Sequence, residues 1–208
     1  MQGVLLEHRQ LIAYFEKCDP RMADVIKAVG PLKLKPDKQY FVVLAHAIVS
    51  QQISIKAAAT IYKRFTALFD GRRPQPKITL TLTDEAMQEA GLSRQKTTYL
   101  KDLARHFDEG LIKTRRFSTI ENEEIIEQLV QVKGIGRWTA EMFLIFSLNR
   151  LDVLPVDDLG LKAGVQKIYN LKTHPDAKKL RVIGAKWQPY ESIATWYCWQ
   201  YLKINDRK

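Results

Sequence analysis

Residues 129–148 read LVQVKGIGRWTAEMFLIFSL, and this stretch decides the fold. Apolar residues at helical spacing run up to Val130, and a second helical pattern starts near Arg137. A tight turn, Gly134-Ile135-Gly136, must therefore join two helices. Two glycines around one apolar residue allow φ > 0 and let a large partner approach the main chain. We expect Ile135 to plug back between the helices and fix the turn.

The turn has the features of an anion site. Amides at the start of the second helix are expected to point outward, where the helix dipole favours negative charge. Lys133 and Arg137 add positive charge on either side, and Thr139 lies in the first turn of the same helix. The alternative is a plain αα-turn capped by glycines. The flanking cations favour phosphate binding over that alternative.

The composition points the same way. The 208 residues include 33 Lys and Arg against 23 Asp and Glu, a formal net charge of +10. Such a surplus favours a polyanionic partner, because fixed positive charge attracts phosphate and releases its counterions. Hydrophobic residues make up 46% and charged residues 27%, which excludes disordered and fibrous classes.

Nothing in the sequence suggests a membrane or a structural metal. No stretch approaches the ~20 apolar residues of a membrane span, and the N-terminus lacks a secretory signal. The two cysteines, Cys18 and Cys198, are too few for an all-cysteine zinc site or a four-cysteine iron–sulfur cluster. The histidines have no ligand-like spacing, and His46, on an apolar helix, is expected in the core. We therefore expect an intracellular protein without zinc, an iron–sulfur cluster or a membrane partner.

Start and stop signals predict an all-α chain of roughly ten short helices. A helix is expected to begin at Asp37, and residues 70–79 form the clearest loop. Few segments alternate with the period of a strand. Side chains that can cap a following helix recur along the chain, at Asp19 before Pro20, Ser54, Thr83 and Ser93. A division into two lobes would place residues 35–120 in a middle helical lobe, and 1–34 with 121–208 in a terminal lobe.

The chain resembles a known family over most of its length, from about Leu32 to Lys203. Residues 129–148 and the following LDVLPVDDLGLKAGV (151–165) look like the helix-hairpin-helix (HhH-GPD) DNA glycosylase superfamily. Within it they resemble the 3-methyladenine DNA glycosylase II (AlkA-like) branch. Other family-like segments are AIVSQQISIKAAATIY (47–62), GLSRQKTTYLKDLA (91–104) and KWQPYESIATWYCW (186–199). The resemblance implies a two-lobed helical fold, without the N-terminal β domain of longer members, that binds duplex DNA across a cleft.

Two aspartates, Asp157 and Asp158, stand at a proline-led helix start. Position alone favours a capping role for such a pair. Loss of a base from a nucleoside builds positive charge on the sugar, which a carboxylate fixed beside C1′ would stabilise. By resemblance, Asp158 occupies the family's catalytic place, and Asp157 is left with capping or support.

The resemblance also bears on mechanism. Members that cut the DNA strand carry a Schiff-base lysine two residues after the second hairpin glycine, and here that place is Trp138. A monofunctional hydrolase is therefore expected, with water as nucleophile and an abasic site as product.

The base pocket is also assigned by resemblance. Trp196 matches the base-stacking tryptophan, Trp138 a second wall, and Gln51 a pocket-side glutamine. Met142 stands where the family often has an aromatic, and Glu191 where it often has an arginine. Most other aromatics of the C-terminal helix are expected in the core.

Two further assignments follow from the family pattern. The segment SQQIS (50–54) looks like the wedge loop that fills the gap left by a flipped base, and either Gln52 or Ile53 could insert. The main-chain carbonyls of Val130, Val132 and Ile135 could hold a sodium or potassium ion that bridges to a DNA phosphate. No other cofactor is expected.

The expected activity is a monofunctional DNA glycosylase that removes alkylated purines, such as 3-methyladenine and 7-methylguanine, in base excision repair. The alternatives are a non-catalytic helix-hairpin-helix DNA-binding protein, and a glycosylase of altered scope acting on ethenoadenine or deaminated purines. The expected partner is double-stranded DNA containing alkylated bases, bound by a monomer. The expected location is the cytoplasm or nucleoid in a prokaryote and the nucleus in a eukaryote.

Overall fold

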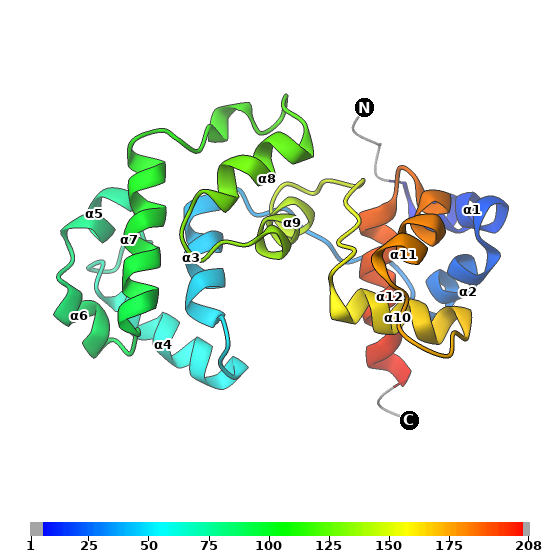
Figure 1. Cartoon of the computed structure of the whole chain (residues 1–208), viewed down its shortest axis with the longest axis horizontal. Helices are drawn as coiled ribbons and strands as arrows, with labels where there is room; N and C mark the ends of the chain where they lie inside the picture. Colours follow the sequence, from blue (N-terminus) through cyan, green and yellow to red (C-terminus); the bar gives the residue numbers. More distant parts are fainter. Residues whose placement is uncertain (1–5, 206–208) are drawn as a thin grey trace. The chain divides into compact units, whose positions relative to one another are not determined.

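The computed structural model describes residues 6–205, which form twelve α-helices and two 3₁₀ turns (Figure 1). No β-strand occurs among these residues, so the prediction of an all-α fold is confirmed. No described helix combines the length and the apolar character needed to cross a bilayer. The helices are α1 (His8–Cys18), α2 (Pro20–Val29), α3 (Tyr40–Ser50), α4 (Ile55–Ala67), α5 (Pro76–Thr81), α6 (Asp84–Glu89), α7 (Arg94–Asp108), α8 (Asn122–Val130), α9 (Arg137–Phe146), α10 (Leu159–Tyr169), α11 (Ala177–Gly184) and α12 (Glu191–Asn205), with 3₁₀ turns at Thr114–Arg116 and Ala185–Trp187.

The chain divides into two compact units. The first combines Met1–Lys35 with Leu144–Lys208, and the second is Pro36–Phe143. The first boundary lies one residue from the predicted one. The second differs from the expected position at 121, because residues 121–143 pack on the middle helices. The Tyr40 ring, for example, contacts the rings of Phe117 and Phe143 edge-on.

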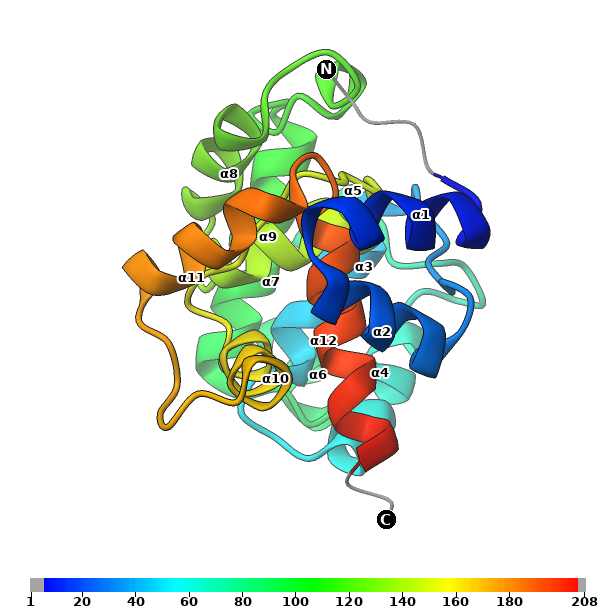
Figure 2. The ribbon, with the colours of Figure 1, turned by 90° about the vertical axis from the view of Figure 1, so that its right-hand side faces the viewer.

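The first unit is built around α12. This helix packs against α2 on one side and α10 on the other, as Figure 2 shows. Trp187 and Tyr197 are completely buried in the hydrophobic core of the first unit. Asp19, only 4% exposed, caps α2 and accepts hydrogen bonds from Trp187 Nε1 (3.0 Å) and the Tyr169 hydroxyl. A buried carboxylate needs such donors, because an unpaired one costs several kcal/mol, roughly.

Two glycines set the spacing between α10 and α12. A Cβ at Gly164 would lie 2.7 Å from Cys198 Cβ, and one at Gly160 would lie 2.9 Å from Trp199 Cδ1. These glycines are four residues apart and share one face of α10. Only a face without side chains allows the two helices to approach this closely.

In the second unit, α3, α5 and α6 pack on α7, and α4 packs on α3. The unit also contains α8 and the start of α9. Its core includes completely buried Leu44, Ile48, Phe65 and Leu100. His46 is exposed and meets the Tyr62 ring edge-on, so its expected place in the core is wrong.

Helix starts were predicted correctly at three positions where a side chain caps the helix. The side chains of Ser54, Thr83 and Ser93 each accept a main-chain amide of the following helix, as expected. The prediction of a helix start at Asp37 is wrong by three residues. Asp37 instead accepts the amide of Gln39 (2.9 Å) in a local turn, and α3 begins at Tyr40.

The predicted loop at 70–79 is also partly helical. Pro76 occupies the first turn of α5, where its missing N–H costs nothing. The packing of this short helix on α7 stabilises it, and Thr79 is buried there. This tertiary contact has no counterpart in the local sequence pattern.

Candidate functional site

The hairpin turn lies between α8 and α9 in the second unit. Gly134 has φ +84°, and a Cβ there would lie 2.1 Å from Cδ2 of the Tyr99 ring. Ile135 is 4% exposed and plugs the turn, as the sequence predicts. Gly136 differs from expectation, because its φ lies outside the left-handed region and a Cβ would meet nothing within 4 Å. Only the first glycine is therefore required by the fold of the turn.

The turn uses two of its own amides internally. Lys133 N donates to Asp102 Oδ2 (2.8 Å), and Ile135 N donates to the Val132 carbonyl (3.0 Å). The Ala140 amide donates to the Gly136 carbonyl at 3.1 Å, so the free amides at the start of α9 follow directly after Gly136 and can face a phosphate. Thr139, half-buried, lies in this first turn.

The two cations beside the turn differ in their surroundings. Lys133 is exposed. The Arg137 guanidinium donates to both carboxylate oxygens of Glu123 (2.7 Å each) and to Glu141 Oε1 (3.2 Å). The hydrogen bonds to Glu123, with the charge of Glu141, raise the pKa of Arg137, and the same pairing lowers the pKa of Glu123. Arg137 therefore supplies less net positive charge at the turn than its position in the sequence suggests.

Asp158, like Asp19 and Glu191, is a buried carboxylate of the first unit, and it is 7% exposed. It is the N-cap of α10 and accepts the amide of Leu161, as a capping aspartate does. The same oxygen, Oδ1, accepts a hydrogen bond from Trp199 Nε1 at 2.8 Å. Capping alone would not require this second donor. Asp157, by contrast, is exposed and lies 3.8 Å from Lys162 Nζ. Of the two roles expected for it, capping belongs to Asp158 instead, and support stays a prediction.

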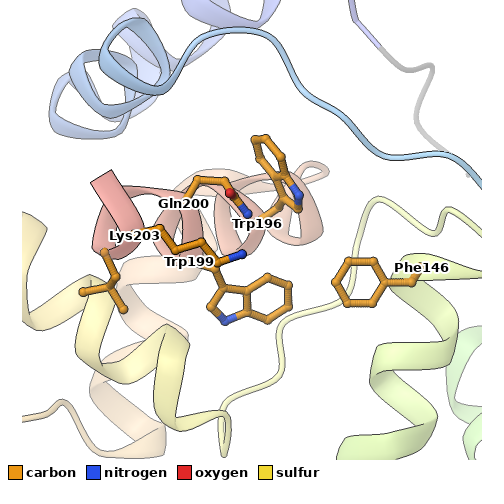
Figure 3. Close-up of a pocket in the computed structure, with 6 residues that line it drawn as sticks. Phe146, Trp196, Trp199, Gln200 and Lys203 are labelled. Atoms are coloured by element: carbon orange, nitrogen blue, oxygen red, sulfur yellow. The ribbon is translucent and has the colours of Figure 1, made fainter. Parts of the chain in front are cut away.

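Trp199 belongs to the aromatics of the C-terminal helix, most of which the sequence pattern places in the core. It follows Trp196 by three positions, which places both indoles on neighbouring parts of the α12 surface. Its ring stacks on Phe146, with centroids 5.7 Å apart and planes at 20°. Figure 3 shows the two indoles extending from α12 in different directions, with the Trp199 ring on the side of Phe146. The spacing of the tryptophans was visible in the sequence, but their approach to Asp158 depends on how α10 meets α12.

These aromatics line two hollows of the first unit. The first, with a volume of about 440 Å³, lies along α12, and the second, of about 580 Å³, lies by residues 32–35. Phe146 and Trp196 line both. The remaining lining residues are Trp199, Gln200, Leu202 and Lys203 in the first hollow, and Leu32, Lys33, Leu34 and Lys35 in the second.

Residues 45–189 match the family described as the HhH-GPD superfamily base excision DNA repair protein. The chain belongs to this superfamily. A curated relative, DNA-3-methyladenine glycosylase 1 of Schizosaccharomyces pombe, is 37% identical over 193 residues, which cover 90% of this chain and 85% of the relative.

Solved structures of superfamily members agree with the fold. DNA-3-methyladenine glycosidase from Bacillus halodurans matches with a TM-score of 0.86 at 36% identity, covering 97% of this chain and 91% of that one. The S. pombe 3-methyladenine DNA glycosylase Mag1, solved in complex with abasic DNA, matches with a TM-score of 0.82 at 34% identity. That match covers 95% of this chain and 98% of Mag1.

The base-pocket residues expected from the superfamily pattern fall in both units. Trp196, 8% exposed, lines the hollows of the first unit and also belongs to its core. Gln51, Trp138 and Met142 belong to the second unit, where Trp138 is 51% exposed and Met142 is half-buried. Gln51 donates its amide to the Gly134 carbonyl at 2.8 Å.

Glu191, the other departure from the superfamily pattern, is 6% exposed in the first unit. Burial raises the pKa of its carboxyl, and the nearby Asp152 charge adds to the effect. Its Oε2 atom has no hydrogen-bond partner among the described residues.

The expected wedge segment is a solvent-facing turn. Gln52 has φ +56° and is exposed, and Ile53 is 37% exposed. Ile55, at the first position of α4, is 91% exposed, and the sequence reasoning did not single it out. An apolar side chain so exposed beside the turn is a third candidate for insertion.

The ion site expected at the hairpin stays a prediction. The Val132 carbonyl already accepts the Ile135 amide, which leaves one lone pair of that oxygen for an ion. Over residues 6–205, no group of three or more His, Cys, Asp or Glu side chains could hold a metal ion.

The two hairpin glycines should respond differently to alanine. Gly134→Ala should lower the free energy of unfolding by about 3 kcal/mol, because it combines a left-handed backbone with a clash against Tyr99. Gly136→Ala should change it by less than about 0.5 kcal/mol. Urea unfolding of both variants measures the difference, and equal destabilisation would contradict this account of the turn.

Trp199→Phe should test the hydrogen bond to Asp158. It removes the Nε1 donor and keeps an aromatic ring against Phe146. A hydrogen bond to a charged group contributes roughly 1.5–3 kcal/mol, so a less firmly held carboxylate should slow base release about tenfold. Single-turnover rates on methylated duplex DNA measure this, with Trp199→Leu as the variant that also loses the ring. A wild-type rate in Trp199→Phe would show that the indole N–H does not orient Asp158.

Proposed function

We propose that the chain is a monofunctional DNA glycosylase that hydrolyses the N-glycosidic bond of alkylated purines of the 3-methyladenine and 7-methylguanine type. The observation that carries the proposal is Asp158, a buried carboxylate fixed by two N–H donors in the unit that holds the aromatic hollows. Membership of the base excision repair superfamily and the similarity to 3-methyladenine glycosylases support it.

Asp158 supplies the charge that the reaction needs. As the glycosidic bond breaks, positive charge develops on the sugar, and a preoriented carboxylate stabilises it. The same group can orient or deprotonate the attacking water. Its two donors hold the carboxylate in one rotamer, so little reorganisation is needed at the moment of reaction.

The aromatic residues suit a positively charged base. A purine alkylated at N3 or N7 carries a formal positive charge in the nucleoside, and electron-rich indole faces attract such a charge. Trp196 and Trp199 provide these faces in the first unit. The charge also makes the base a good leaving group, so no strong general acid is required.

DNA is the proposed partner, bound by one copy of the chain. The net charge of +10 attracts the phosphate backbone, and the start of α9 offers amides to one phosphate. A sodium or potassium ion on the carbonyls of Val130, Val132 and Ile135 would add a further contact to that phosphate.

A second candidate substrate is a neutral purine lesion, such as 1,N6-ethenoadenine. The observation that favours it is the charge of the hollows: Lys203 lines one, and Lys33 and Lys35 line the other. Ammonium groups beside a base disfavour a cationic purine and tolerate a neutral one. Release of ethenoadenine faster than 7-methylguanine would favour this candidate.

Asp158→Asn should abolish base release and leave DNA binding equal or stronger. The amide oxygen can still accept both N–H donors, but it lacks the charge that stabilises the sugar cation. We expect the single-turnover rate to fall at least about a hundredfold. Asp157→Asn, an exposed neighbour that loses the same charge, is the matched control and should keep the wild-type rate. A wild-type rate in Asp158→Asn would show that Asp158 is not the catalytic carboxylate.

Borohydride should not trap the enzyme on DNA. A strand-cutting member forms an imine between a lysine and the sugar, and here Trp138 stands at the position of that lysine. Incubation with lesion-containing duplex and borohydride, followed by a denaturing gel, should show free protein only. A covalent adduct, seen alongside a known bifunctional enzyme as positive control, would contradict monofunctional hydrolysis.

A further inference from the structure

One stripe of α7 holds two loops of the second unit. Lys96, Tyr99 and Asp102 follow one another at intervals of three residues, so they lie along the same side of the helix. Lys96 Nζ donates to the carbonyls of Val49 (2.7 Å) and Gln51 (2.8 Å), at the end of α3. These carbonyls carry the negative end of the α3 dipole, which a cation stabilises.

The other two residues of the stripe hold the hairpin. The Tyr99 ring fills the space beside Gly134, and Asp102 Oδ2 accepts the Lys133 amide at 2.8 Å. Burial opposes ionisation of Asp102, but the Lys133 amide and the Arg105 guanidinium outweigh it and lower the pKa of the carboxyl. The hairpin turn therefore rests on a charged acceptor.

Gln51 closes the connection between the two loops. Its carbonyl accepts from Lys96, and its side-chain Nε2 donates to the Gly134 carbonyl at 2.8 Å. A continuous chain of contacts thus runs from Lys96 through Gln51 to Gly134. All of its members belong to the second unit.

The turn that begins at Gln51 is held in a strained form. Gln52, the next residue, has φ +56°, a left-handed conformation that costs a residue other than glycine roughly 1–2 kcal/mol. Such a conformation persists only when the surroundings impose it. Lys96 is half-buried, and burial lowers the pKa of its ammonium, so its placement at the carbonyls also costs free energy.

We propose that Lys96 is a positioning residue, which locks the turn at residues 51–54 to the hairpin turn so that phosphate binding at the hairpin and insertion into the DNA stack occur in one fixed register. This inference rests on the proposed glycosylase function. Loss of Lys96 should leave the phosphate contacts of the hairpin intact and release the turn that carries Gln52 and Ile53.

The test compares Lys96→Met with Lys101→Met. Lys101 lies on the same helix and pairs with Asp84, so its variant loses the same charge without touching either loop. On a duplex containing 7-methylguanine, Lys96→Met should lower the single-turnover rate at least tenfold, and Lys101→Met should keep it within twofold. Both should bind undamaged duplex with the wild-type affinity and the wild-type dependence on salt.

Two further variants separate positioning from folding. Lys96→Arg should restore the rate to within about threefold, because a guanidinium also donates to two carbonyls. Gln51→Leu, which removes the link to Gly134 and keeps Lys96, should lower the rate about fivefold and tests the connection even if Lys96→Met does not fold. These outcomes together would support the proposal.

Three results would overturn it. Equal rates for Lys96→Met and Lys101→Met would show that the lock does not matter. A weaker affinity for undamaged duplex with a flatter salt dependence in Lys96→Met would make Lys96 a phosphate ligand. A wild-type rate in Gln51→Leu would break the connection to the hairpin. Failure of the proposed function is distinct, because the wild-type protein itself would then release no base.

Discussion

The hydrogen bond from Trp199 to Asp158 depends on how closely α10 can approach α12. Gly160 and Gly164 leave one face of α10 without side chains, and Cys198 and Trp199 occupy that space. The Asp158 carboxylate then meets two donors, one from its own helix and one from α12. A substituent on either glycine would separate the helices and remove the donor that distinguishes this aspartate from an ordinary cap. The chemistry of the first unit thus rests on helix packing.

In the second unit, the structure depends on contacts from α7 that hold two loops in place. Its hairpin and the turn at residues 51–54 are loops, which are usually the most mobile parts of a fold. Here α7 fixes both, through a cation on carbonyls and a carboxylate on an amide. The positive charge of Arg137 beside the hairpin is also offset, because its guanidinium pairs with the carboxylates of Glu123 and Glu141. The surplus of +10 is therefore a property of the whole chain more than of this turn.

The sequence predicted correctly those features that depend only on neighbouring residues, such as helix caps and the apolar residue of the hairpin turn. The caps at Ser54 and Ser93 and the plug at Ile135 were confirmed because each needs only a few adjacent positions. The superfamily pattern predicts Asp158 as the catalytic carboxylate, and the structure adds that this carboxylate is buried and accepts two N–H donors. Helix α5 and the start of α3 were missed, because packing on α7 and a side-chain turn at Asp37 override the local pattern.

Long-range contacts account for the rest of what the sequence could not show. The spacing of Trp196 and Trp199 is visible in the sequence, but the hydrogen bond from Trp199 to Asp158 joins residues 41 positions apart. Likewise, Gln51 looked like a pocket residue, and the structure shows that its amide binds a carbonyl 83 positions away. Charge neutralisation of Arg137 by Glu123 also requires α8 and α9 to be placed side by side. None of these pairs leaves a periodic signal.

The most direct measurement of the central claim is chromatography of the bases released from methylated duplex DNA by the wild-type protein. A monofunctional glycosylase should yield free 3-methyladenine and 7-methylguanine, each matched by an abasic site in an otherwise intact strand. Duplex binding without release of any base would contradict it and would make the chain a DNA-binding module of the superfamily.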